Sequence, residues 1–259
     1  MKKRLKELYD YRQMIFSLVK KDLRGRYKGS VLGFAWTFVN PLFQLIIYTI
    51  VFDYILKTDI PNYKLFLFVA LIPWLFFQSS VSNGAGSIIA QKDLVKKIYF
   101  PREVIPISYV TGCFVNMLLC FIIVFAVALI SGVHISILGL LCLPLVMIVE
   151  YFFALGITLL VSAITVYFRD LEHIMSIITM AWMYVTPIVY QETLVPDRFM
   201  KIYRLNPMRS IIAAYRDILY FGSVPKLGTL IEAVVLGIVF LLLGSFVFNK
   251  LMRRFAEEL

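Results

Sequence analysis

Residues that could carry proton or acid–base chemistry are few in this chain and lie far apart. It has two histidines, His134 and His173, and Glu150 is the acidic residue placed deepest in an apolar stretch. A proton-driven carrier needs several ionisable groups within its membrane helices, so ion coupling is poorly supported. We expect Glu150 to be kept neutral or paired with a hydroxyl, while a functional role for it stays open.

The motifs of nucleotide, metal and nucleophilic chemistry are missing from the sequence. No GxxxxGK[ST] segment occurs, so the chain has no P-loop with which to hydrolyse ATP itself. Cys113, Cys120 and Cys142 fall in apolar stretches without CxxC or Cys/His spacing, and they are interpreted as buried small hydrophobes. We expect no cofactor and no metal on this chain, which makes a transport or binding role more plausible than an enzymatic one.

Six long apolar stretches must position these residues. Hydrophobic residues make up 61% of the 259-residue chain and the mean hydropathy is +0.84, well above soluble domains at roughly 45–50% apolar. A helix of about 20 apolar residues crosses a bilayer with every backbone polar group satisfied. The sequence thus predicts an all-α integral membrane protein, a single domain over 1–259. The predicted spans are 31–56, 63–90, 105–130, 136–168, 173–190 and 228–249.

The distribution of Lys and Arg sets the expected orientation. The side holding both ends of the chain carries eighteen of them and the opposite side eight. The richer side is cytoplasmic by the positive-inside rule, so both termini are expected inside. Six of the eight basic residues on the opposite side lie in the outer segment 191–227, which weakens the difference in charge between the two sides. No cleaved signal peptide is expected, because residues 1–30 contain no uninterrupted apolar core.

Residues 1–30 form a basic arm with helical periodicity. Leu8, Tyr11, Ile15 and Leu18 recur every three or four positions, and basic residues crowd the later part of the arm. This pattern predicts an amphipathic helix at the cytoplasmic membrane surface. Attraction to anionic lipid and docking of a protein partner explain it equally well.

Two cytoplasmic segments combine charge with apolar side chains. The first is QKDLVKKIYFPREVIP, where we expect a short surface helix over Lys92–Tyr99, ended by Pro101. An ordinary positive-inside loop would account for the charges of this segment but not for its apolar residues Leu94, Ile98 and Tyr99. Exposed apolar side chains on a cytoplasmic loop indicate a protein partner. The second is the corner YFRDLEH, with Arg169 and Asp170 at its turn.

Aromatic and polar residues within the spans could line a path. Aromatic rings stack on sugar rings, and Tyr adds a hydroxyl donor, although aromatic belts and ordinary packing also explain such residues. The polar run in the second half of span two should face protein or water rather than lipid. The candidate path residues are Trp36, Phe43, Tyr48, Phe77, Gln78, Trp182, Tyr184 and Tyr190.

The outer segment 191–227 contains at least one amphipathic helix. Ile211, Tyr215 and Ile218 form an apolar stripe, with Arg209 and Arg216 on the opposite face. Asn206 and Pro207 supply the cap and first-turn residue. The sequence leaves open whether this helix lies flat on the surface or dips back as a gate.

Six motifs in order give the chain a family resemblance. They are RYKGSVLGFAWTFVNPL, LIPWLFFQSS, KKIYFPREVIPI, YFRDLEHI, TPIVY and LNPM. Together they resemble the ABC-2 type polysaccharide-export permeases, which include O-antigen, teichoic acid and rhamnan exporter subunits. The resemblance implies a homodimer of six-span subunits with two copies of a separate ABC ATPase, which binds ATP and Mg. It further implies transport of a polyprenyl-linked polysaccharide out of the bacterial cytoplasmic (inner) membrane, with no nucleic-acid partner.

The resemblance also implies roles for segments of the chain. The arm would provide an interface helix, 191–227 outer gate helices and 250–259 a cytoplasmic tail, and the basic arm could attract the pyrophosphate of the substrate. An ABC-2 exporter of a drug or small lipid, and a membrane enzyme of glycan assembly, remain as alternatives. The implied interface-helix residues are Arg24, Arg26, Tyr27 and Lys28, and the implied ATPase-coupling residues are Lys92, Leu94, Lys96, Lys97, Ile98, Tyr99, Arg169 and Asp170.

Overall fold

A computed structural model describes residues 2–25, 29–252 and 255–258, and within these ranges the chain is helical without a strand. Arg26, Tyr27 and Lys28 of the predicted interface helix lie outside the described residues. The helices are α1 (Lys2–Asp10), α2 (Arg12–Gly25), α3 (Trp36–Tyr48), α4 (Tyr63–Ala85), α5 (Ser87–Ala90), α6 (Lys92–Lys97), α7 (Val104–Ile130), α8 (Ile137–Thr165), α9 (Leu171–Val185), α10 (Asp197–Tyr203), α11 (Pro207–Leu219), α12 (Leu227–Leu251) and α13 (Phe255–Glu258). Three shorter elements are η1 (Gly33–Ala35), η2 (Thr49–Ile55) and η3 (Glu192–Leu194).

Five helical segments of the described chain are long and apolar enough to cross a membrane. They are Gly33–Ile55, Tyr63–Ala85, Val104–Ile130, Ile137–Thr165 and Leu227–Leu251, and they match five of the six predicted spans. The stretch predicted as span five, 173–190, instead overlaps the 15-residue helix α9, which begins at Leu171 and ends at Val185. Pro187 explains its end, because the residue before a proline is disfavoured in the helical region, and Thr186 is extended.

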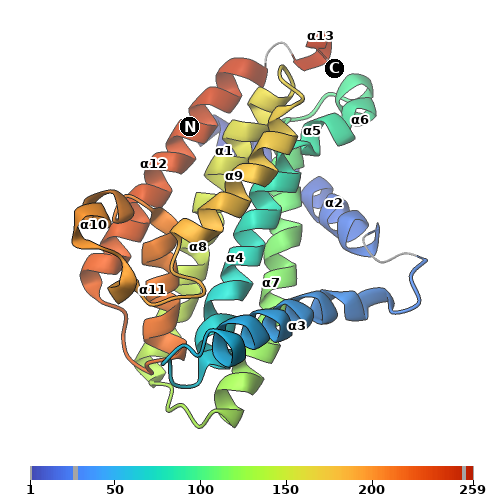
Figure 1. Ribbon diagram of the computed structural model, residues 1–259. Coiled ribbons are helices and arrows are strands. Elements are labelled where there is room, and N and C mark those ends of the chain that lie inside the picture. The colour runs from blue at the N-terminus through green and yellow to red at the C-terminus, as the bar shows by residue number, and fades with distance from the viewer. Residues whose placement is uncertain (1, 26–28, 253–254, 259) are drawn as a thin grey trace.

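Helix α4 forms the centre of the helix bundle. Of its apolar stretch, 83% is buried, against 17% for the segments Gly33–Ile55 and Leu227–Leu251. It packs against α7, α8, α9 and α11, and Figure 1 shows it enclosed by them. The outer helices leave apolar faces uncovered, as helices do where lipid or another subunit can contact them.

A pair of glycines lets α8 and α12 cross at close range. A Cβ added at Gly244 would overlap the carbonyl group of Gly156, and one added at Gly156 would come within 2.5 Å of the Leu241 nitrogen. Small residues at a crossing bring two backbones into contact, which increases packing between membrane helices. This contact fixes α12 on α8.

The first apolar segment stands apart from the rest. Helix α3 crosses α4 and α7 at a steep angle, whereas the other long helices run roughly alongside one another (Figure 1). The uncovered side of α3 exposes Phe43, Ile46 and Ile47, and Ile50 of η2 is exposed as well. An apolar face of this size needs lipid or a protein surface against it.

Both termini lie at the same end of the molecule as α6, which we call the α6 end (Figure 1). The predicted amphipathic arm is present as α1 and α2, and α2 packs against α7. Leu8, Tyr11, Ile15 and Leu18 turn toward the core, as their spacing predicted. The arm is therefore held on the bundle by its apolar face.

Helix α11 packs deep among α4, α8 and α12. The Asn206 side chain accepts a hydrogen bond from the Met208 amide at 3.1 Å and Pro207 occupies the first turn, so the predicted helix start is confirmed. The prediction of a polar face that includes Arg216 was wrong, because this side chain is 6% exposed. It is buried because α11 is surrounded on all sides instead of lying with one face in water.

Candidate functional site

The predicted coupling segment forms a short helix at the α6 end. Helix α6 ends at Lys97, two residues before the predicted end, and Ile98 is extended. Val95 is 5% exposed and anchors the helix, while Tyr99 is 92% exposed. The remaining predicted members are the exposed Lys92, Lys96, Lys97 and Ile98 and the half-buried Leu94. The segment thus presents cationic and apolar side chains outward from a fixed base.

Contacts from both ends of the chain hold the loop after α6. The Tyr11 hydroxyl donates to the Tyr99 carbonyl at 3.4 Å, which joins the N-terminal arm to this loop. Arg102 donates to the Met252 carbonyl and lies over the Phe255 ring, with its guanidinium carbon 5.9 Å from the ring centre. A hollow of about 580 Å³ lies along Lys96, Tyr99, Arg102 and Met252. The coupling segment is therefore positioned by residues distant in sequence.

The second predicted contact lies at the turn between α8 and α9. Arg169 and Asp170 are exposed there, next to Phe168, which is 70% exposed. The Tyr167 hydroxyl donates to the Leu251 carbonyl at 2.9 Å and ties this turn to the end of α12. Both predicted docking segments thus contact the C-terminal part of the chain.

A cavity of about 510 Å³, whose lining includes Asp22 and Glu172, lies beneath α2 at the same end. Asp22 of α2 lies against Gly112 of α7, and Glu172 of α9 lies against Gly86, where an added Cβ would collide with each carboxylate. Arg24 is exposed on the last turn of α2. The arm therefore covers a hollow between the helices as well as contacting the surface.

The structure separates the candidate path residues into three groups by their burial. Phe77 is fully buried and stacks on Phe153 with ring centres 5.3 Å apart, so it belongs to the core of the subunit. Phe43 and Tyr184 are 58% and 63% exposed and face outward. The half-buried members are Trp36, Tyr48, Gln78, Trp182 and Tyr190.

The polar half of α4 faces neighbouring helices, as predicted. Ser82 and Thr179 share a hydrogen bond of 2.7 Å, and Thr158 donates to the Ser80 carbonyl at 2.9 Å. These contacts connect α4 with α9 and α8. Ser79 lines a further cavity of about 230 Å³ between α3, α4 and α7, beside Trp36.

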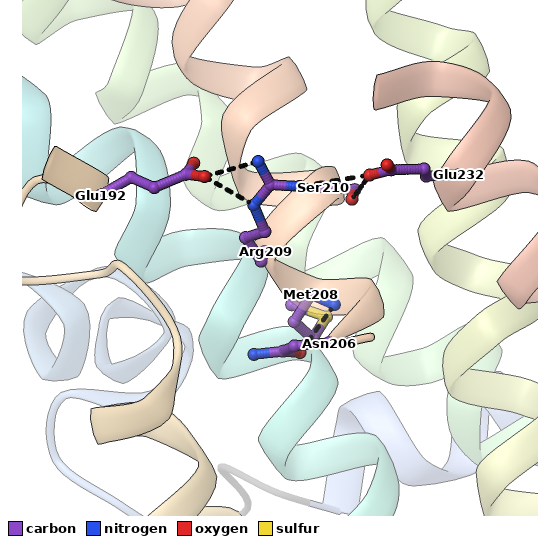
Figure 2. Close-up of polar contacts among 6 residues, drawn as sticks. All are labelled: Glu192, Asn206, Met208, Arg209, Ser210 and Glu232. Atoms are coloured by element: carbon purple, nitrogen blue, oxygen red, sulfur yellow. Dashed lines mark hydrogen bonds and ion pairs between the residues drawn. The ribbon is translucent and has the colours of Figure 1, made fainter. Parts of the chain in front are cut away.

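A polar network around α11 was not predicted from the sequence. Arg209 contacts Glu192 Oε1 at 2.5 Å and Glu232 Oε2 at 3.1 Å, and Ser210 donates to the same Glu232 oxygen at 2.9 Å (Figure 2). Trp182 donates to Asn206 Oδ1 at 2.9 Å, so Asn206 links α9 as well as capping α11. The charged residues were visible in the sequence, two in the outer segment and Glu232 in predicted span six, but the members of each pair are distant in sequence.

These features define a class of protein: a multi-helix membrane protein whose sequence contains no P-loop motif, with a short helix that presents cationic and apolar side chains at one end. The chain belongs to the ABC-2 type transporter family, whose model matches residues 13–220. It is 34% identical over 261 residues to the O-antigen export system permease protein RfbA of Myxococcus xanthus, covering 98% of both chains.

Two further relatives support the same family. The chain is 36% identical over 259 residues to the O-antigen export system permease protein RfbA of Klebsiella pneumoniae, covering 100% of this chain and 98% of the relative. It is more distantly similar, at 21% identity over 216 residues, to the polysialic acid transport protein KpsM of Escherichia coli, covering 81% and 82% of the two chains. The resemblance inferred from the six sequence motifs is confirmed.

Proposed function

We propose that this chain is the transmembrane permease subunit of an ATP-driven exporter that moves a lipid-linked cell-surface polysaccharide across the bacterial cytoplasmic membrane. The relatives that match nearly its whole length are named as O-antigen export permeases. A homodimer would work with two copies of a separate ATPase, which binds ATP and Mg. The α6 end and both termini would face the cytoplasm, and α9 would serve as the fifth of six spans.

The observation that carries this proposal is the arrangement of buried and exposed side chains in the coupling segment. Val95 is buried while Ile98 and Tyr99 are 54% and 92% exposed, so the segment combines a rigid base with an uncovered apolar tip. Lys96 and Lys97 add positive charge next to that tip. An apolar patch rimmed by charge suits a protein partner, and this chain has no P-loop of its own.

The transport path would form between two subunits. Helix α3 exposes Phe43 and Ile47, and α9 exposes Ile177 and Tyr184. The Tyr48 hydroxyl lies 3.8 Å from the Met183 sulfur, so the two helices meet near their outer ends. Pairing these faces across a dimer would cover them and place aromatic rings along the interface, where they can stack weakly on sugar rings.

ATP binding would draw the two ATPase subunits together and move the docked α6 segments. The contacts of Tyr99 with Tyr11 and of Arg102 with Met252 would pass that movement to the arm and to α12. The path between spans one and five would then open for the polymer. Outer gate helices within 191–227, with α11 among them, would close it on the far side.

The test is association with the ATPase encoded beside this chain. We expect a stable complex that hydrolyses ATP, and we expect Tyr99→Ala combined with Lys96→Glu and Lys97→Glu to uncouple it. Tyr54→Ala is the matched control, because Tyr54 is also exposed, at 65%, but belongs to η2 at the outer end of the first apolar segment. Failure of the unaltered chain to associate with the ATPase would remove the proposal.

A further inference from the structure

A cavity of about 580 Å³ lies beside α11, between the segment after α9, α10 and the start of α12. We call it the α11 cavity. Its lining includes Phe66 of α4, Glu192 of η3, Met200 of α10 and Thr229 of α12, so five elements converge on it with α11. Three cationic side chains also line it, namely Arg209, Arg216 and Lys226.

Arg216 is the unusual group in this lining. It is 6% exposed, and its guanidinium carbon lies 3.5 Å from the centre of the Phe66 ring. Its Nη2 donates to the Ile188 carbonyl at 2.8 Å, whereas its buried Nε has no hydrogen-bond partner. No ion pair involves Arg216 within the described part of the chain. A buried cation without an anion is costly, and a cation–π contact of about 2 kcal/mol does not offset that cost.

The carboxylates that line the same cavity are engaged elsewhere. Glu192 contacts Arg209, which also binds Glu232, and these contacts use the forked donors of Arg209 (Figure 2). Asp217 accepts a hydrogen bond from the Lys226 amide at 3.3 Å. Arg216 therefore keeps donor capacity that the neighbouring acids do not fill.

The charge of the outer segment agrees with a role in binding anions. Residues 191–227 contain six Lys or Arg and three Asp or Glu. Membrane proteins tend to keep basic residues out of short non-cytoplasmic segments, so a positive excess on the proposed outer side needs another reason. Attraction of an anionic group is such a reason.

We propose that the α11 cavity binds a phosphate group, with Arg216 as its central donor and Lys226 at its mouth. A guanidinium matches the oxygens of a phosphate in charge and in shape. The phosphate belongs either to a phospholipid headgroup or to the exported lipid-linked polymer. Assignment of the phosphate to the exported polymer rests on the proposed function, whereas the proposal that the cavity binds phosphate does not.

Binding is tested on the full chain, purified without any ATPase in a neutral detergent. Inorganic phosphate, with sodium chloride as the reference at equal ionic strength, should raise the midpoint of thermal unfolding by about 3 °C at several times its Kd. Arg216→Gln should abolish that shift, and Lys226→Gln should reduce it. Arg198→Gln is the matched control, because Arg198 also lies over a phenylalanine, Phe199 at 4.6 Å, but does not line the cavity. It should keep the full shift.

The source of the phosphate is resolved with nanodiscs of digalactosyldiacylglycerol, which lacks phosphate, with or without phosphatidylglycerol. Phosphatidylglycerol retained by the unaltered chain and lost from Arg216→Gln, measured by native mass spectrometry, assigns the site to a lipid headgroup. A response to inorganic phosphate without lipid retention assigns it to the polymer.

No phosphate-specific shift in the unaltered chain, or an equal shift in Arg216→Gln, overturns the proposal. If Arg216→Gln does not fold, Lys226→Gln decides, and a shift equal to that of the unaltered chain overturns the proposal. Because no ATPase is present, failure here leaves the ATPase-association test of the proposed function unaffected.

Discussion

Tyr215 of α11 donates a hydrogen bond of 2.7 Å to Oε2 of Glu150 in α8, and both side chains are fully buried. The other carboxyl oxygen, Oε1, has no hydrogen-bond partner. The pairing of Glu150 with a hydroxyl that the sequence suggested is therefore present, and the hydroxyl comes from the outer segment. This contact joins α11 to the middle of the longest helix.

Removing the hydroxyl should destabilise the protein. Tyr215→Phe leaves both oxygens of Glu150 unpaired, and we expect a loss of about 2 kcal/mol, the cost of one unsatisfied buried polar group. Glu150→Gln keeps an acceptor for Tyr215 and should cost less. Thermal unfolding in detergent measures both losses. A Tyr215→Phe loss no larger than the Glu150→Gln loss would show that the bond contributes nothing.

The close contact between Gly156 and Gly244 predicts that alanine will affect stability differently at two glycines of α12. Gly244→Ala should destabilise α12 on α8 by about 1–3 kcal/mol, because its new methyl group would overlap the Gly156 carbonyl. Gly237→Ala on the same helix meets only ordinary contacts of 3.6–3.8 Å. It should be neutral or stabilising, since alanine favours a helix. Equal thermal stability of the two variants would contradict the predicted close crossing.

The ion pairs of Arg209 should stabilise the outer part of the bundle. Arg209→Gln releases Glu192 and Glu232 together, and we expect a loss of about 2 kcal/mol because the arginine side chain is only 14% exposed. Arg204→Gln is the control, since Arg204 is exposed in the same segment. In a double-mutant cycle, Glu192→Gln should cost much less in the Arg209→Gln background than alone. An unchanged cost would refute the pairing.

Apolar periodicity and length were enough to predict the long helices and the arm. They work because a membrane helix must satisfy its backbone internally, which leaves few choices of structure. The Asn206–Pro207 start of α11 was also predictable, since capping depends on adjacent residues. Local signals of this kind do not depend on how the chain folds back on itself.

Other features depend on contacts between distant residues and were not predictable. Arg216 was assigned to the face opposite the apolar stripe because the periodicity of α11 describes one helix alone, not the three helices α4, α8 and α12 that pack around it. In the sequence, Phe77 and Phe43 look alike, as aromatic residues within predicted spans. In the structure, Phe77 is in the core and Phe43 faces outward. Arg102 and Met252 are 150 residues apart, so no sequence window contains both.

The C-terminal contact of the coupling segment leads to a prediction about function that is separate from stability. Phe255 is fully buried and packs against Tyr167 and Phe248, beneath Arg102. Phe255→Ala should loosen the loop that carries Tyr99, and we expect a several-fold loss of ATPase stimulation in the complex while the complex still forms, because the docking residues themselves are unchanged. Glu258→Ala, at an exposed position three residues further on, should leave stimulation intact. Equal stimulation by the Phe255→Ala and Glu258→Ala complexes would show that the C-terminal contact does not position the coupling segment.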